Sequence, residues 1–182
     1  MNLWLRLIWL VLTVRLRGRL EAPLGVSRLR FRVWPHDLDT SLHMNNGRYW
    51  TLMDLGRTDL MLRLGLWRAW LRHGWTPVIT AGTIRYRREL KPFQQFTLET
   101  RVLCWEDTFL VMEHRMVTRG ANGHDVTHAV ALVRGGLYDR KSRAFVRIEQ
   151  LMAVMGISAG SPPASPEVRA FLAAESAMRK AG

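Results

Sequence analysis

Cysteine is almost absent from this sequence, since Cys104 is the only one in 182 residues. A chain with one cysteine cannot form an intramolecular disulfide or a cysteine-based metal cluster. The sequence therefore fits a reducing compartment, and we expect no metal site. Cys104 lies in an alternating strand pattern with no obvious base beside it, which favours an inert buried thiol over a nucleophile.

Acidic residues are also scarce: 15 Asp and Glu stand against 27 Lys and Arg, for a net charge of +12. Such an excess suits an anionic partner, whether nucleic acid, a phosphorylated small molecule or an acidic membrane surface. An arginine-rich solvated surface explains it equally well. Because the sequence has no helix-turn-helix, zinc-finger spacing or RRM-type aromatic motif, we expect no specific nucleic-acid partner.

No apolar run is long enough to cross a bilayer. Residues 3–16 are nearly all apolar, but Arg6 and Arg15 interrupt them, and the run is shorter than the ~20 residues that a spanning helix needs. A signal-peptide cleavage site is missing. Leu and Trp beside Arg suit a helix in a membrane interface, although a helix packed on the domain or on a partner subunit is the alternative. The basic residues that follow predict a cytoplasmic protein, with peripheral contact at the inner face of a membrane.

The remaining pattern predicts an α+β protein with one core, because 48% of its residues are hydrophobic. We expect a strand over residues 28–34, a long helix from 46 to 64 and a short helix over 67–73. Strands are expected over residues 78–89, 96–105, 109–118 and 126–138, and helices over 148–155 and 166–180. Short turns predict that successive strands are antiparallel neighbours. The apolar stripe of the long helix then covers one face of the sheet.

Three segments follow from this order. Residues 1–20 form an apolar and basic helix, residues 28–146 the main domain, and residues 147–182 a helical extension. On the long helix, we expect Asp59 on the polar face, paired with Arg63 one turn later.

The segment from Asp37 to Tyr49 carries most of the chemistry in the sequence. Two carboxylates, a histidine and two asparagines gather where a strand pattern gives way to the long helix. The first N–H groups of a helix have no partner within the helix and attract negative charge. A carboxylate and backbone donors are therefore expected side by side at this junction.

These residues also carry a resemblance. The matching positions are Asp37-Leu38-Asp39, Leu42-His43-Met44-Asn45-Asn46, Arg48-Tyr49, Asp54, Ile84 to Arg88 and Lys91-Pro92-Phe93. The chain resembles the hotdog-fold thioesterases of the 4-hydroxybenzoyl-CoA thioesterase superfamily, and most of all the group called thioesterase superfamily member six. The resemblance implies a hotdog fold, a long central helix wrapped by a curved antiparallel sheet of about five strands. It also implies a coenzyme A or acyl-carrier thioester as substrate, no cofactor, and a homodimer or dimer of dimers joined sheet edge to sheet edge.

Carried onto this sequence, the resemblance makes Asp39 the catalytic carboxylate, acting as general base on water or as nucleophile. The alternative is a turn-forming or helix-capping acceptor. Asp37 would point the opposite way and is expected to be structural. His43 would orient water or hold Asp39, with a backbone-bonded loop histidine as the alternative. Ser41 departs from relatives that carry asparagine there, which puts the carboxylate–amide–imidazole form of the mechanism in doubt.

Asn46 completes the expected catalytic set of Asp39, His43 and Asn46 by offering its backbone N–H to an oxyanion. Asn45, Gly47 and Tyr49 are expected to contact substrate, although capping and core packing are simpler roles for them. Arg85 and Arg87 are candidates for the phosphates of coenzyme A, or else belong to an exposed strand face. Two functions compete: an acyl-CoA thioesterase, and a non-catalytic hotdog protein that binds acyl thioesters or acts as a membrane-associated scaffold.

Overall fold

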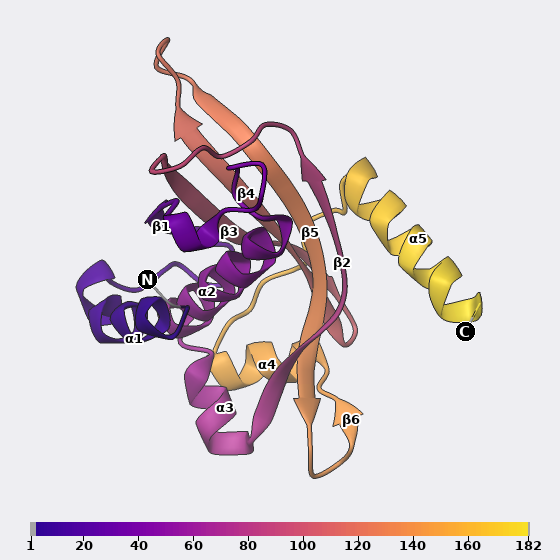
Figure 1. Ribbon diagram of the computed structural model, residues 1–182. Helices are drawn as coiled ribbons and strands as arrows, with labels where there is room; N and C mark the ends of the chain where they lie inside the picture. Colours follow the sequence, from indigo (N-terminus) through magenta and orange to yellow (C-terminus); the bar gives the residue numbers. More distant parts are fainter. Residues whose placement is uncertain (1–2, 182) are drawn as a thin grey trace.

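The structure, a computed structural model, describes residues 3–181 and consists of a curved antiparallel sheet wrapped around a long helix (Figure 1). The helices are α1 (Leu3–Thr13), α2 (Asn46–Leu64), α3 (Trp67–His73), α4 (Ile148–Met155) and α5 (Pro166–Ala181), with short 3-10 turns at Val14–Arg17 and Pro35–Asp37. The strands are β1 (Ser27–Arg32), β2 (Trp75–Tyr86), β3 (Gln95–Glu106), β4 (Phe109–Arg119), β5 (Asp125–Asp139) and β6 (Ala144–Phe145). This is the α+β arrangement that the sequence predicts.

The strand order corrects one expectation. The sheet runs β1-β3-β4-β5-β2, so β2 and β3 are not neighbours. Strand β2 forms one edge of the sheet, and β3 lies next to β1 at the other edge. Residues 87–94 are therefore a crossover rather than a hairpin turn. They pass over the start of α2, where the Met44 N–H donates to the Leu90 carbonyl at 3.0 Å. The crossover then joins the end of β1, because the Phe93 N–H donates to the Val33 carbonyl at 2.9 Å.

The bounds of β2 also differ from the predicted 78–89. The strand begins at Trp75, directly after Gly74 ends α3 in the left-handed conformation. Pro77 is tolerated because β2 is an edge strand, where a missing N–H removes no ladder bond on the open side. The strand ends at Tyr86 because the Arg87 and Arg88 N–H groups both turn to the His128 carbonyl.

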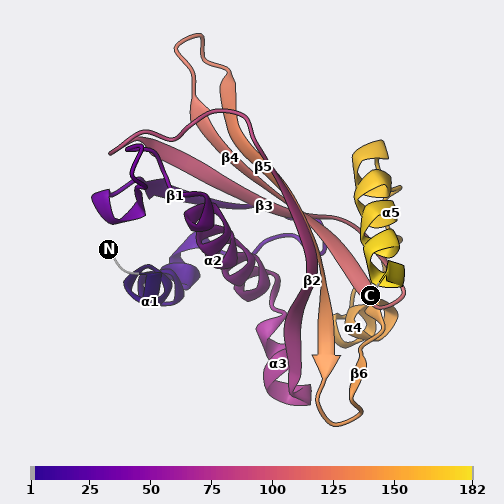
Figure 2. The ribbon, with the colours of Figure 1, turned by 45° about the vertical axis from the view of Figure 1, so that its right-hand side comes forward.

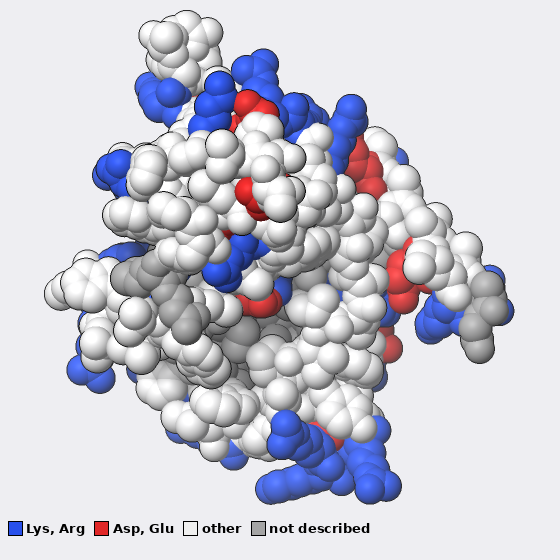
Figure 3. All heavy atoms as spheres, viewed as in Figure 1, with Lys and Arg blue, Asp and Glu red and all other residues white. Residues whose placement is uncertain are grey.

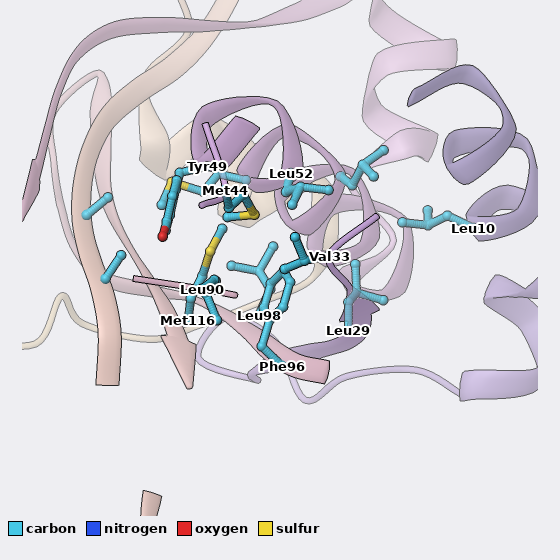
Figure 4. Packing of buried hydrophobic residues seen from close by; sticks show 14 residues of the cluster. Leu10, Leu29, Val33, Met44, Tyr49, Leu52, Leu90, Phe96, Leu98 and Met116 are labelled. Atoms are coloured by element: carbon cyan, nitrogen blue, oxygen red, sulfur yellow. The ribbon is translucent and has the colours of Figure 1, made fainter. Parts of the chain in front are cut away.

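The core lies between α2 and the concave face of the sheet (Figure 4). Helix α2 begins with Asn45 as its cap and ends at Gly65, which takes the left-handed conformation. Leu52 and Met53 are fully buried on its inner face. Gly56 lets the helix approach β3 closely, since a Cβ there would stand 2.4 Å from the Thr100 Oγ1.

Asp59 is not on the polar face, which corrects the prediction. Its side chain is fully buried and accepts from Arg17 at 2.9 Å and from the Ser27 hydroxyl at 2.6 Å. Arg63 approaches it at 3.4 Å, so the expected pair exists but points inward. A buried carboxylate needs such partners, and these come from a segment more than 30 residues upstream. Asp59 thus ties the N-terminal segment to α2.

The remaining helices cover other surfaces (Figures 1 and 2). Helix α4 packs against α3 through Leu151 and Ile148, while α5 lies on the opposite face of the sheet, where Val168 covers Cys104. Burial raises the pKa of the Cys104 thiol, as an inert cysteine requires. Within residues 3–181, no helix has both the length and the apolar character to traverse a bilayer.

Candidate active site

The loop before α2 is a tight, self-bonded structure. Leu38 and Met44 form an isolated antiparallel bridge, and the Asp39 N–H donates to the His43 carbonyl at 2.9 Å. Leu42 at the turn has a φ of 59°, a conformation that costs a branched residue energy and is retained only where the surroundings hold it. The loop therefore presents its side chains in fixed positions.

Asp39 is held by one of its two oxygens. Its Oδ1 accepts from the Ser41 N–H at 2.9 Å and from the His43 N–H at 3.3 Å. This is the turn-forming role considered above. The Asp39 Oδ2 makes no hydrogen bond to any of the described residues. One oxygen thus orients the carboxylate and the other is open to a substrate or a water molecule.

Asp37 has the structural position that its spacing predicted. Its side chain is buried, and its Oδ2 accepts from Arg6 at 2.6 Å and from the Trp34 N–H at 3.0 Å. The Asp37 carbonyl accepts from the Asn45 N–H at 2.9 Å. Asp37 therefore fixes both ends of the loop and joins it to α1.

The His43 imidazole pairs with Glu89, and His43 bonds to Asp39 only through its backbone. The His43 Nε2 lies 2.8 Å from the Glu89 Oε2, and both side chains are close to half exposed. Glu89 was not predicted as a site residue, because it lies 46 positions further along the chain in what read as the end of a strand. Only the crossover brings it to the loop, so the sequence held no local signal for it.

The crossover is anchored by His128 of β5, which sequence reasoning also missed. The buried His128 ring donates from Nδ1 to the Glu89 carbonyl at 2.9 Å, so its Nε2 accepts from the Thr118 hydroxyl at 2.9 Å. The His128 carbonyl accepts the N–H groups of Arg87 and Arg88 at 2.8 and 3.2 Å. His128 thereby fixes the backbone of Glu89 and of the two residues before it.

The start of α2 lies next to this loop. The Asn45 Oδ1 accepts from the Gly47 N–H at 2.8 Å, so the Gly47 donor is already used by the cap. The Asn46 N–H has no partner among residues 3–181, and its carbonyl accepts from the Tyr86 hydroxyl at 3.3 Å. Among the donors predicted at this helix start, Asn46 is the one open to an oxyanion.

Tyr49 is buried one turn into α2, beside Met44 and Leu90 (Figure 4). Its pKa is raised to about 12, mainly by burial; the hydrogen bond to the Leu90 backbone lowers it, and the nearby Tyr86, Asp39 and Glu89 add to the rise. The ring of Tyr86 meets it edge-on at 5.0 Å. Tyr49 therefore keeps a neutral hydroxyl at physiological pH.

A basic groove opens beside the His43–Glu89 pair. It has a volume of about 850 Å³, and its lining residues are Arg87, Arg88, Glu89, Lys91, Gln94, Thr118, Val126 and His128. Arg87 thus lies where an anion could bind. Arg85 does not line this groove: it is exposed on β2, one residue after Ile84, which packs on the core.

An apolar cavity of about 240 Å³ lies further along α2, between the helix and strands β2 and β5. Its walls include Leu60, Met61, Val78, Ile79 and Met112, and Asp54 and Arg57 stand among them. Behind Arg57, the buried His114 accepts from it at 3.2 Å and donates from Nδ1 to the Thr100 hydroxyl at 3.0 Å. Burial and the nearby Arg57 charge lower the pKa of His114 to about 3, so it is neutral.

Among the described residues, no group of three or more His, Cys, Asp or Glu side chains is placed to hold a metal ion. The candidate site is thus made of Asp39, His43, Glu89 and the Asn46 N–H at the start of α2. Glu89 joins this site to the basic groove, because it pairs with His43 and also lines the groove.

The fold is the hotdog fold, since a curved antiparallel sheet wraps a long helix as in solved thioesterases. The sequence profile of the thioesterase-like superfamily matches residues 33–172, and the chain belongs to that superfamily. Protein THEM6 of Xenopus laevis is 44% identical over 85 residues, which are 47% of this chain and 41% of that protein. The matches to the THEM6 proteins of Danio rerio and Drosophila melanogaster cover 57% and 61% of those proteins. The chain therefore spans less than two thirds of the length of these relatives.

Two solved structures share the fold. A probable thioesterase of Escherichia coli, YbaW, has a TM-score of 0.63 at 20% identity, covering 69% of this chain and 93% of that one. The 4-hydroxybenzoyl-CoA thioesterase of Pseudomonas sp. strain CBS-3 has a TM-score of 0.61 at 15% identity, covering 71% of this chain and 98% of that one. At these identities the likeness concerns the fold.

Proposed function

We propose that this protein hydrolyses acyl-coenzyme A thioesters, with Asp39 as the catalytic residue. The observation that carries the proposal is the geometry of Asp39, anchored through Oδ1 and open at Oδ2 beside the start of α2. Membership of the thioesterase-like superfamily supports this choice of reaction. The name of the 4-hydroxybenzoyl-CoA enzyme, which shares the fold, supports the choice of carrier.

In the water route, the Asp39 Oδ2 takes a proton from water as the water oxygen attacks the thioester carbonyl carbon. The negative oxygen that forms is held by the Asn46 N–H and the positive end of α2. The carbon–sulfur bond then breaks, and the thiolate leaves as the proton returns to it. In the alternative route, the Asp39 Oδ2 attacks the carbonyl carbon, the carbon–sulfur bond breaks and the thiolate leaves, which gives a mixed anhydride. Water then hydrolyses the anhydride to the free acid, restores the Asp39 carboxylate and supplies the proton that the thiolate takes up.

His43, oriented by Glu89, supports either route by holding the attacking water close to the carbonyl. The 3′-phosphate and diphosphate of coenzyme A suit the groove that Arg87 lines, with Arg88 and Lys91 as further cations. Arg85 stays a candidate only if the nucleotide extends over β2.

The acyl group would extend along α2 toward the apolar cavity. From Asn46 to Asp54 the helix advances about 12 Å, so the cavity suits the far end of an aliphatic chain rather than the thioester. Its volume of about 240 Å³ is smaller than the ~300–1,000 Å³ of typical ligand sites. A second protomer joined at the open edge of β2 would cover it and complete the site.

The test is a thiol-release assay on acyl-CoA substrates of several chain lengths. Asp39→Asn keeps an Oδ1 acceptor for the Ser41 and His43 N–H groups, so the loop is preserved while the charge is lost. We expect kcat to fall by about 100-fold or more. Asp125→Asn, an exposed carboxylate paired with Arg119 on the far hairpin, is the control and should match the wild type.

The competing function is binding of acyl thioesters without turnover. It is favoured if the wild-type protein binds acyl-CoA but releases no thiol at any chain length. If Asp39→Asn instead hydrolyses as fast as the wild type, Asp39 is not the catalytic residue and the proposed mechanism is wrong.

A further inference from the structure

Helix α1 has two apolar faces, of which the fold uses only one. Its inner face places Leu10 in the core with Leu7 against it, and buries Arg6. Its outer face is exposed although it is apolar: Trp4 is 68%, Trp9 66% and Leu12 71% accessible. A surface helix normally turns charged or polar residues to solvent. The outer face of α1 is therefore expected to contact a surface outside this fold.

The charges of the helix and of the residues that follow it, up to residue 20, are all positive. Residues 3–20 contain no Asp or Glu, and the exposed Arg15 and Arg19 follow the helix directly. In the space-filling view, the surface over α1 is mostly uncharged, with Lys or Arg atoms at its margins (Figure 3). Tryptophan, leucine and arginine in this arrangement are typical of helices that lie in the headgroup region of a bilayer.

The length of α1 decides its orientation on a membrane. Its 11 residues extend about 16 Å, roughly half of the ~30 Å hydrocarbon core. It is therefore too short to insert across a bilayer. With Leu10 and Arg6 held in the fold, it can only lie along the surface with Trp4, Trp9 and Leu12 submerged.

A second copy of this chain is the weaker choice of occupant. The sheet has two edge strands, β1 with 6 residues and β2 with 12, so β2 offers the longer edge to a second copy. Helix α1 and β2 lie on opposite sides of α2 (Figures 1 and 2). A dimer joined through β2 would leave the outer face of α1 uncovered. The net charge of +12 favours an anionic surface as the partner of this face.

We propose that the outer face of α1 docks the protein on an anionic lipid bilayer, with the helix in the plane of the headgroups. Arg6 then links the docked helix to the candidate active site, because its guanidinium holds Asp37 at the base of the loop. Docking thus sets the loop of Asp39 beside the bilayer surface. The lipid-binding surface does not depend on hydrolysis, so either proposal can fail without the other.

The test is co-sedimentation of the full-length protein with vesicles of phosphatidylcholine alone or mixed with phosphatidylglycerol. We expect binding to the anionic vesicles that weakens with added salt. The variant Trp4→Gln/Trp9→Gln/Leu12→Gln should bind about tenfold more weakly or worse. Arg15→Gln/Arg19→Gln should lose most of the preference for phosphatidylglycerol. Circular dichroism and thermal unfolding confirm that each variant is folded, and protein sedimented without vesicles corrects for aggregation.

The matched control is Met178→Gln, which removes an exposed apolar side chain from α5 and should bind as the wild type does. The proposal is overturned if the wild type ignores anionic vesicles, or if the triple variant binds them equally well. It is also overturned if the triple variant instead changes the oligomeric state in solution, since the face would then be a protein interface. Thiol release measured without vesicles reports on hydrolysis separately.

Discussion

At the scale of residues, some polar atoms of the candidate site hold the loop and the helix cap in place, and others stay open to a substrate. The Asp39 Oδ1 accepts hydrogen bonds within the turn, while its Oδ2 is open. The Gly47 N–H donates to the capping Asn45 side chain, while the Asn46 N–H is open. The sequence predicted Asp39 and Asn46 as site residues because they stand together in one short segment. It could not identify Glu89, whose place beside His43 depends on a crossover between distant strands.

His114 makes the stability of the protein depend on acidity. Its pKa is lowered from 6.5 to about 3 in the folded protein, so the unfolded chain takes up a proton first as pH falls. The contribution of neutral His114 to the free energy of unfolding is therefore fully present above pH 6.5. It is lost as pH falls toward 3, by up to about 5 kcal/mol. Urea unfolding as a function of pH measures this loss.

In that experiment, His114→Gln should flatten the dependence over this range. His124→Gln, which removes an exposed histidine from the β4–β5 turn, should leave it unchanged. Equal slopes for the wild type and His114→Gln would contradict the assignment.

At the scale of elements, the close packing of α2 on β3 depends on the absence of a side chain at Gly56. Gly56 lies against Thr100, and an added Cβ would stand 2.4 Å from the Thr100 Oγ1, which already bonds to His114. Gly56→Ala gains helix propensity but must displace that hydroxyl, for a net loss of about 1–2 kcal/mol. Chemical denaturation measures it.

Gly160→Ala is the matched control, because its Cβ would meet nothing within 4 Å. A Gly56→Ala protein as stable as the control would show that α2 can move away from β3 without cost.

The periodicity of the sequence predicted α2 and most strands, because burial on one face leaves a repeating pattern. It failed for Asp59, whose partners Arg17 and Ser27 come from a different part of the chain. It failed for the place of β2 because a short connection reads as a hairpin whether or not the strands pair. Contacts between distant segments leave no local pattern, and these two errors share that cause.

At the scale of the whole molecule, β2 offers an open edge for assembly. No strand pairs with its outer side within the described part of the chain, and Ile79 and Tyr86 are exposed there. We expect a homodimer joined through β2, because an unpaired edge with apolar side chains is a template for another strand. Light scattering should then give twice the protomer mass.

A charge on this edge should dissociate the dimer. Ile79→Lys desolvates an ammonium in the joint and is expected to give monomers, while Val154→Lys on α4 should not. A monomeric wild type, or a dimeric Ile79→Lys, would rule out this mode of assembly.

The buried ion pair of Arg6 and Asp37 shows that the folded domain extends beyond the residues that match the superfamily. The superfamily match begins at residue 33, yet the carboxylate of Asp37 is neutralised by a guanidinium 31 positions earlier. Asp59 depends in the same way on Arg17. A fragment cut at the edge of the match would leave Asp37 with Arg48 and Asp59 with Arg63, each 3.4 Å away, in place of the closer guanidinium groups of Arg6 and Arg17. We therefore expect a fragment without α1 to be less stable, even though the superfamily match does not include that helix.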